Sequence, residues 1–311
     1  MKAINCVLTG IILLSAIVIS PCVAQQVGEE IKTVKQLYPN LAAGILTYAK
    51  VNTLQDGVLL KASDIQITQS DVDAAIAKQP QQFQQELTRN AFFILEQEAT
   101  EKLLKKLAKE RLSVQGRDVN SMDADQMIKT FFEDLAKDVN VAAGDVEIFY
   151  KENESIFCGT PLEKVRNQIE SYVLQDKKQR FADEYIKTVG QRIDIQVSGT
   201  WTNAQARLAK DNPLDKARTN GKPTLAVFSA KSCCGPDKML PVMKTVQEKC
   251  GGKVNIVYIE PRQEQILSAR YGIRAIPTQI FYDAVGQEFF RHSGFFSDKD
   301  IFAKLNDIGV K

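Results

Sequence analysis

Histidine is almost absent from this sequence, since His292 is the only one among 311 residues. A Ser-His-Asp triad or a histidine-rich metal site would need this one residue to lie in the right place, so neither explains the function well. Net charge is also nearly absent, because 40 lysines and arginines stand against 38 aspartates and glutamates. This balance argues against a nucleic-acid groove and a polybasic membrane anchor. We therefore expect no metal, no cofactor and no nucleic-acid partner.

Long apolar runs are lacking after the N-terminal segment, so we expect no membrane insertion of the mature chain. The one such run spans residues 7–19, and small residues at Cys22 and Ala24 fit signal cleavage before Gln25. A retained anchor is the weaker alternative, because it would need ~20 apolar residues. Lipid attachment at Cys22 is weaker still, because Pro21 occupies a position where a small residue is usual. We predict a signal peptide over the first 24 residues and a soluble periplasmic or otherwise exported protein.

Cysteine is scarce in the chain that remains, which keeps Cys158, Cys233, Cys234 and Cys250. Export permits disulfides, but four thiols cannot form a disulfide scaffold for a chain of this length. The adjacent pair Cys233 and Cys234 points instead to a thiol site. We expect Cys158 and Cys250 to be small buried hydrophobic residues.

The first half of the chain shows helical periodicity. The length corresponds to about two domains, and apolar residues recur at three- and four-residue steps between residues 83 and 107 and between residues 162 and 189. This spacing is typical of amphipathic helices. Thr160-Pro161-Leu162-Glu163 is the clearest helix start, with a capping hydroxyl, proline and glutamate in order. We predict an all-α domain over residues 25–198, with one short strand at residues 65–68 and a helix capped at Ser70 and Asp71.

The pattern changes class after residue 198. Periodicity lapses over residues 199–221, where Asn-Pro and Asn-Gly pairs predict a linker. Strands and helices then alternate, which predicts a small α/β domain over residues 222–311 and a two-domain α+β chain as a whole. The expected strands are residues 224–228, 254–259, 278–282 and 287–291, and the expected helices are residues 236–249, 262–271 and 298–305.

This second half resembles thioredoxin, on two motifs. Phe228-Ser229-Ala230 leads into Cys233-Cys234-Gly235-Pro236, and Tyr271-Gly272-Ile273 leads into Ile276-Pro277-Thr278. The resemblance implies catalytic roles for Cys233 and Cys234 and a cis peptide bond before Pro277. It also implies that a client peptide binds as an added strand. The implied binding residues are Gly235, Pro236, Ile276, Pro277 and Thr278.

The thioredoxin-like motif lacks its second thiol. Depending on the register, Cys233 attacks and Pro236 replaces the resolving cysteine, or Cys234 attacks and Asp237 replaces it. Thioredoxins carry a buried acidic residue just before this phenylalanine and a lysine partner on the next strand. Here Val227 replaces the acidic residue, and an apolar or aromatic residue near Tyr258 replaces the lysine.

Cα–Cα distances limit which other cysteines can form a disulfide with the attacking thiol. A vicinal Cys233-Cys234 bridge would be strained, because adjacent Cα atoms are only about 3.8 Å apart. Cys250 lies about 20 Å along the helix, too far for a disulfide. Only Cys158 or a client thiol remains.

The helical half resembles the chaperone region of SurA and related parvulin-type folding factors. The matching segments are residues 63–73, 146–153 and 161–169. In those proteins a prolyl isomerase domain lies between the last two segments, whereas only residues 154–160 separate them here. The resemblance implies binding of unfolded polypeptides without prolyl isomerase activity.

These observations lead to one expectation and two alternatives. We expect an exported factor for protein folding and thiol homeostasis, which binds unfolded clients and traps client thiols at a single-thiol site. Covalent complexes would then accumulate without any substitution. The first alternative is a thiol-disulfide oxidoreductase, with a vicinal or external resolving thiol and a possible redox partner protein. The second is a scaffold or adaptor without redox chemistry.

Overall fold

The computed structural model describes residues 31–310 except residue 40 and residues 231–238, and side chains 155 and 156 are also left out. Residues 31–310 belong to one compact unit. The predicted signal peptide and the predicted site residues Cys233, Cys234, Gly235 and Pro236 lie outside the described residues. Within the described part of the chain, none of the helices combines the length and apolarity that a membrane span needs.

The first half of the chain contains a four-stranded sheet as well as helices, so the expectation of an all-α domain is wrong. Its strand order is β1-β4-β2-β3, in which β4 pairs parallel with β1 and antiparallel with β2. The strands are β1 (Lys50–Asn52), β2 (Val58–Ala62), β3 (Ile65–Thr68) and β4 (Ile195–Ser198). Three to five residues are too few to show a clear alternation, and β4 is separated from β2 by more than 130 residues of sequence. Only β3 was predicted, and it is confirmed.

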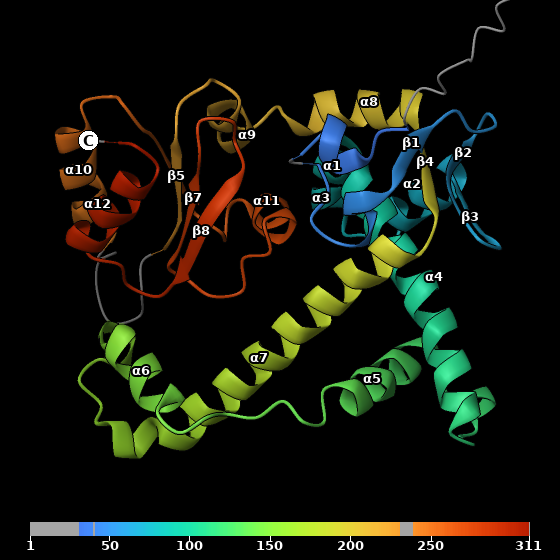
Figure 1. The fold of residues 1–311 in the computed structure, drawn as a ribbon, viewed down its shortest axis with the longest axis horizontal. Coiled ribbons are helices and arrows are strands. Elements are labelled where there is room, and N and C mark those ends of the chain that lie inside the picture. The colour runs from blue at the N-terminus through green and yellow to red at the C-terminus, as the bar shows by residue number, and fades with distance from the viewer. Residues whose placement is uncertain (1–30, 40, 231–238, 311) are drawn as a thin grey trace, which may run out of the picture. The chain divides into compact units, whose positions relative to one another are not determined.

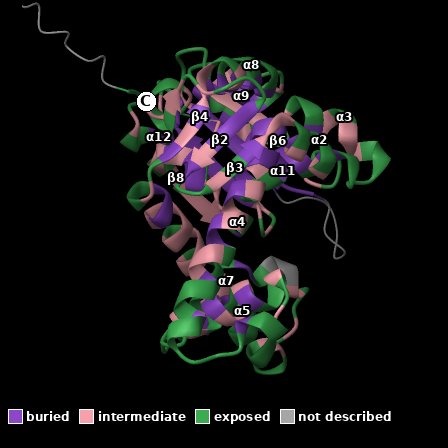
Figure 2. Ribbon diagram, turned by 90° about the vertical axis from the view of Figure 1, so that its right-hand side faces the viewer, coloured by how far each residue is buried: buried purple, intermediate pink, exposed green. Residues whose placement is uncertain are grey.

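Helices surround this sheet and extend away from it (Figure 1). The buried apolar side chains of α4, β2 and β4 share one core with those of α1 and α2. Figure 2 shows buried residues concentrated in the strands, while α5 combines buried, partly buried and exposed residues. The helical elements are α1 (Val34–Leu37), η1 (Ile45–Tyr48), α2 (Gln69–Ala77), α3 (Gln81–Arg89), α4 (Ala91–Val114), η2 (Val119–Ser121), α5 (Ala124–Leu135), α6 (Asp145–Glu152), η3 (Glu154–Phe157) and α7 (Leu162–Arg192).

Two predicted helix starts differ in detail. Helix α2 is capped by Thr68, whose hydroxyl accepts from the backbone of Asp71 while the Asp71 carboxylate accepts from the backbone of Thr68. The cap therefore lies two residues before the predicted Ser70. Helix α7 begins after Pro161 and has no side-chain cap, because Thr160 lies one residue too early to cap it.

The second half builds the predicted α/β arrangement. Its sheet has the order β6-β5-β7-β8, in which β5 pairs parallel with β6 and antiparallel with β7, and β7 pairs antiparallel with β8. Helices α10 and α12 pack on one face of this sheet, and residues of α9 and α11 pack on the other. The predicted strands and helices are confirmed to within a few residues: β5 (Thr224–Phe228), α10 (Met239–Cys250), β6 (Asn255–Ile259), α11 (Gln265–Arg270), β7 (Thr278–Tyr282), β8 (Glu288–Ser293) and α12 (Asp298–Asp307).

The segment between the halves is helical rather than irregular, and it contains α8 (Gly199–Ala209) and α9 (Pro213–Arg218). Asp215 on α9 is 1% exposed and accepts a hydrogen bond of 2.6 Å from the Tyr271 hydroxyl. Arg270 forms an ion pair with the same carboxylate at 3.2 Å, and Arg218 donates to the Tyr271 hydroxyl at 2.8 Å. These buried bonds attach α9 to α11, so this segment is packed against the second sheet.

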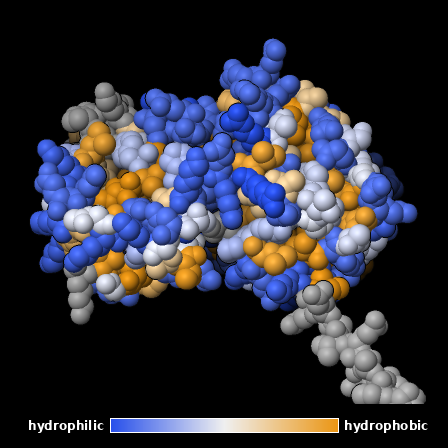
Figure 3. Space-filling model, turned by 90° about the horizontal axis from the view of Figure 1, so that it is seen from above, coloured by the Kyte–Doolittle hydropathy of each residue, from blue (hydrophilic) through white to orange (hydrophobic). Residues whose placement is uncertain are grey.

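Seen from the side that carries α8 and α9, the surface mixes hydrophilic and apolar side chains (Figure 3). The apolar ones form small groups between charged ones. Such an arrangement is normal for the surface of a folded protein.

Candidate functional site

The loop before β7 has the conformation that the sequence predicts. The Ile276-Pro277 peptide bond is cis. Ile276 is 39% exposed, and among the described residues nothing hydrogen-bonds to its backbone N–H or C=O. The carbonyl of Pro277 accepts from the backbone N–H of Gly294 at 2.8 Å, which fixes the loop to the residue after β8. Thr278 is buried, and its hydroxyl donates to the carbonyl of Ala275 at 2.7 Å. Within the described residues, the backbone of Ile276 thus has no hydrogen-bond partner, while the loop around it is held in place.

The strand that leads to the cysteine pair lies beside this loop. Phe228 at the end of β5 pairs with Thr278 at the start of β7, and Thr278 pairs with Ser293 at the end of β8. These three strand ends therefore lie together at one edge of the sheet. Cys233 follows Phe228 by five residues, although the cysteine pair itself lies outside the described residues.

No acid lies at the buried position below the site. Val227 is fully buried in β5 and pairs with Tyr258 on β6, as the sequence comparison predicts. The Tyr258 hydroxyl donates to the carbonyl of Ser229 at 3.0 Å. On the other side Val227 pairs with Gln279, whose buried amide donates to the carbonyl of Gly294 at 3.2 Å. Valine and glutamine side chains cannot relay a proton at neutral pH.

His292 lies in β8, opposite Gln279. Its ring stacks on Phe296 with the ring centroids 4.4 Å apart, and its Nε2 lies 3.3 Å from the carbonyl oxygen of Phe295. Burial lowers the pKa of His292, while that hydrogen bond and the charges of Glu152 and Asp300 act in the opposite direction. His292 is thus the titratable ring of this sheet edge, and the negative charge of Glu152 acts on it from α6.

The end of α6 contacts the same edge. A Cβ atom built on Gly294 would lie 2.5 Å from the side-chain oxygen of Asn153, so the two residues are in tight contact. Asn153 is 5% exposed and caps α6.

Cys158 follows after η3, is exposed, and has φ 54°, in the left-handed region. Cys158 is disulfide-bonded, and its partner lies outside the described residues. The expectation of a buried hydrophobic Cys158 is therefore wrong. Cys250, by contrast, is a free buried thiol, as predicted.

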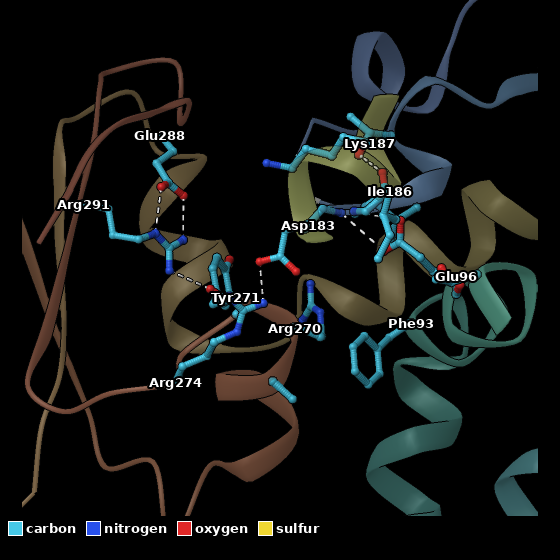
Figure 4. A pocket seen from close by; sticks show the side chains of 18 of the residues that line it. Phe93, Glu96, Asp183, Ile186, Lys187, Arg270, Tyr271, Arg274, Glu288 and Arg291 are labelled. Atoms are coloured by element: carbon cyan, nitrogen blue, oxygen red, sulfur yellow. Dashed lines mark hydrogen bonds and ion pairs between the residues drawn. The ribbon is translucent and has the colours of Figure 1, made fainter. Parts of the chain in front are cut away.

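A cavity of about 1000 Å³ lies on the other side of the Pro277 loop (Figure 4). One wall comes from the second half of the chain, with Ala275, Thr278 and Ser293 next to the loop. The opposite wall comes from η1, α4 and α7. Asp183 of α7 reaches across to Arg274, and their charged atoms are 2.5 Å apart.

Charged side chains stand on both walls of this cavity, among apolar and uncharged polar ones. Figure 4 shows Arg270, Arg274 and Arg291 on one wall and Lys187 on the other. Arg291 forms a bidentate pair with Glu288 at 2.8 to 2.9 Å. Glu96 is buried and accepts from the backbone N–H groups of Gly44 and Leu46 at 2.9 and 3.0 Å. Burial raises the pKa of Glu96, while these hydrogen bonds oppose the rise. The periodicity of α4 and α7 predicted two helices but gave no signal for this shared cavity.

Ligands for a metal ion do not cluster among residues 31–39, 41–230 and 239–310. Of the predicted site residues, the structure brings Ile276, Pro277 and Thr278 together at the sheet edge. Sequence reasoning did not place α6, Asn153 and Gly294 at this edge. The only sequence feature that pointed to this part of the chain was Cys158, which the distance argument left as a possible disulfide partner of the attacking thiol.

Comparison with known proteins agrees with the geometry of the second half. A family model for a thioredoxin-like domain matches residues 211–309. Thioredoxin Y, chloroplastic, from Oryza sativa subsp. japonica is 37% identical over 73 residues, which are 23% of this chain and 41% of that protein. A thiol:disulfide interchange protein TxlA homolog from Synechocystis sp. is 32% identical over 93 residues, 29% of this chain and 51% of the relative. The chain thus spans about half or less of these relatives.

Solved structures give a similar result. A single-site mutant of thioredoxin from Halobacterium salinarum NRC-1 is 25% identical, with 32% of this chain and 83% of that chain covered and a TM-score of 0.28. The family match and the sheet order together show that the C-terminal part of this chain is a thioredoxin-like domain. The resemblance of the first half to SurA stays a prediction.

Proposed function

We propose that this protein is an exported thiol-disulfide factor, which binds extended segments of unfolded polypeptides beside Pro277 and joins their cysteines to Cys233 or Cys234. The observation that carries the proposal is the loop at Ile276, an exposed residue just before β7 whose backbone groups have no hydrogen-bond partner among the described residues. An extended peptide can add to such backbone as a strand. The thiol:disulfide interchange protein among the relatives supports the chemistry.

The cavity supports the polypeptide part of this proposal. It begins at Ala275 and Thr278, next to the loop, and continues between the two halves of the chain. Positive and negative side chains both line it, including Arg274 and Asp183. A client with mixed polar sequence could extend from the loop into this space. In this proposal the first half is a chaperone-like cradle and needs no isomerase activity.

Binding is tested with the full chain and a thiol-free unfolded polypeptide, such as reduced and carboxymethylated lactalbumin. Ile276→Asp places a charge at the strand-addition loop and should weaken binding roughly tenfold, as for a binding hot spot. The measurement is fluorescence anisotropy of the labelled polypeptide. Val285→Asp is the matched control, because Val285 is also an exposed apolar residue, 71% exposed, in the turn at the far end of β7.

Equal effects of the two substitutions would reject binding at the loop. Binding without any covalent capture of a cysteine-containing client would favour the scaffold alternative.

Export is the remaining part of the proposal and depends on the N-terminal sequence. Mass spectrometry of the protein from its native host should find Gln25 as the first residue. Recovery of intact residues 1–24 from a membrane fraction after a high-salt wash would overturn it.

A further inference from the structure

We propose that the outer edge of β8 is a second polypeptide-binding site, to which an extended segment with acidic side chains adds as a fifth strand. This inference rests on the proposed function in one respect, because it requires that the protein binds unfolded polypeptides. The site is distinct from the loop at Ile276, since its hydrogen-bonding groups belong to Arg291 and Ser293. It uses none of the cysteines.

The register of β7 and β8 determines which backbone groups of β8 point away from the sheet. The N–H of Gly294 donates to the carbonyl of Pro277, so these two residues form a hydrogen-bonded pair. Hydrogen-bonded and non-hydrogen-bonded pairs alternate along an antiparallel ladder, which makes Ser293 and Arg291 members of non-hydrogen-bonded pairs. The backbone N–H and C=O groups of Arg291 and Ser293 therefore face outward.

This edge is open to an added strand. β8 is the last strand in the sheet, and among the described residues nothing hydrogen-bonds to the outward backbone groups of Arg291 and Ser293. Natural edge strands are commonly blocked by lysine, by proline or by a covering element, and β8 contains neither lysine nor proline. The Arg291 side chain is held by Glu288 and by the carbonyl of Tyr271. Four backbone groups thus remain for a partner.

An added strand would send alternate side chains into the cavity beside the Pro277 loop. Arg291 and Ser293 line that cavity. Residues directly opposite each other in neighbouring strands carry their side chains on the same face, with Cβ atoms about 5 Å apart. The client residues that pair with Arg291 and Ser293 therefore face the cavity, whose volume of about 1000 Å³ has room for their side chains. Asn153, which lies against Gly294, bounds the site at one end.

The charges in the cavity favour acidic side chains at these positions. Arg274 lies on the same wall as Arg291, and Lys187 lies on the opposite wall (Figure 4). In the described part of the chain, the Arg274 guanidinium has one partner, Asp183, which it contacts through a single nitrogen. A guanidinium carries five N–H donors in a fixed fork. Because the Arg274 side chain is 40% exposed, its remaining donors can bind a client carboxylate.

The test uses the full chain and two fluorescent peptides of about ten residues without cysteine. Both alternate valine and threonine, and the central threonine is replaced by glutamate in one and by lysine in the other. Fluorescence anisotropy should show that the glutamate peptide binds about tenfold more tightly, as for a hydrogen bond to a charged group. Hydrogen–deuterium exchange of residues 288–294 should slow when this peptide binds.

Two substitutions separate the backbone contact from the charge contact. Ser293→Pro removes an outward N–H, at a position where an edge strand tolerates proline, whereas Ser293→Ala removes only the hydroxyl. The proline variant should bind the glutamate peptide about threefold to tenfold more weakly than the alanine variant, as for one lost hydrogen bond. Arg274→Gln should remove the preference for glutamate. Arg111→Gln is its control, because Arg111 also pairs with one carboxylate but is not among the residues that line the cavity.

The outcomes separate this inference from the function on which it rests. If exchange at residues 288–294 does not change on binding, or if Ser293→Pro and Ser293→Ala bind equally, the β8 site is wrong, while weaker binding by Ile276→Asp would still support the Pro277 loop. The converse result would reject the loop and keep β8. Equal binding of the two peptides would overturn the acidic preference. A dimer in sedimentation that Ser293→Pro dissociates would assign the edge to a second copy and overturn the client site.

Discussion

At the scale of single residues, the site differs from thioredoxin by its missing ionisable groups. Val227 and Gln279 lie side by side in the buried sheet, where neither can take up a proton. In the proposed function, a thiolate of the cysteine pair therefore has no buried base at Val227 or Gln279 to depend on. His292 is the residue at this edge whose charge changes near neutral pH.

We predict that His292 makes stability depend on pH between about 5.5 and 7.5. Burial lowers its pKa below the ordinary value of 6.5, so the unfolded chain takes up a proton first as the pH falls. The free energy of unfolding should decrease on acidification from above 6.5 and continue to decrease until the folded protein is also protonated. Urea denaturation at several pH values should show a weaker dependence for His292→Gln.

The variant comparison removes contributions from other groups. Burial raises the pKa of Glu96, which gives the opposite sign and is present in both proteins. The charges of Glu152 and Asp300 act on His292 from α6 and α12. An identical pH profile in the variant would mean that His292 has the same pKa in the folded and unfolded chain.

At the scale of elements, the buried ion network decides how the segment after β4 is packed. Arg218 is 5% exposed, and the side chain of Arg270 is 7% exposed. Both guanidinium groups lie within 4 Å of the Asp215 carboxylate. The guanidinium of Arg218 also lies 3.9 Å from the ring centroid of Tyr282 and donates to the carbonyl of Gly286 at 2.7 Å. Burial raises the pKa of Tyr271 well above its ordinary value, so its hydroxyl stays protonated and can donate to Asp215.

We predict that Asp215→Asn destabilises the protein by about 3 to 5 kcal/mol, because it leaves two buried arginines without their counter-charge. Chemical denaturation measures the loss. Asp211→Asn is the control, since Asp211 pairs with Lys216 on the surface with both side chains more than 60% exposed. The control should unfold at the same denaturant concentration as the unsubstituted protein. Similar losses in both variants would contradict the importance of the network.

At the scale of the whole molecule, the helical half reaches the thioredoxin-like sheet at separate places. Ile266 of α11 joins the core of the first half, Asp183 of α7 pairs with Arg274, and Asn153 meets Gly294. The charged pair is partly exposed and contributes little to stability, on the order of 0 to 1 kcal/mol. The pair instead connects α7 to the residues before Pro277, because it lies across the cavity beside the Pro277 loop. The loop therefore borders the cavity through Ala275 and Thr278.

Local sequence patterns are sufficient to predict the fold of the second half of the protein. Strand and helix lengths, the turn at Gly286, and the Ile276-Pro277-Thr278 motif all act locally, and the structure confirms the sheet and the cis bond. The resemblance to thioredoxin also placed the partner position of Val227 near Tyr258, and the structure pairs these two residues.

The remaining features depend on contacts between residues that are distant in the sequence. The strands β1 and β4 are short and far apart in sequence, so no local periodicity reveals that they pair. The packing of Asp215 depends on residues more than 50 positions away, and charged residues read as surface residues unless their partners are known. Cys158 illustrates the same limit. Its residue type permits a buried, a free or a bonded thiol, and only the structure shows that it is exposed and disulfide-bonded.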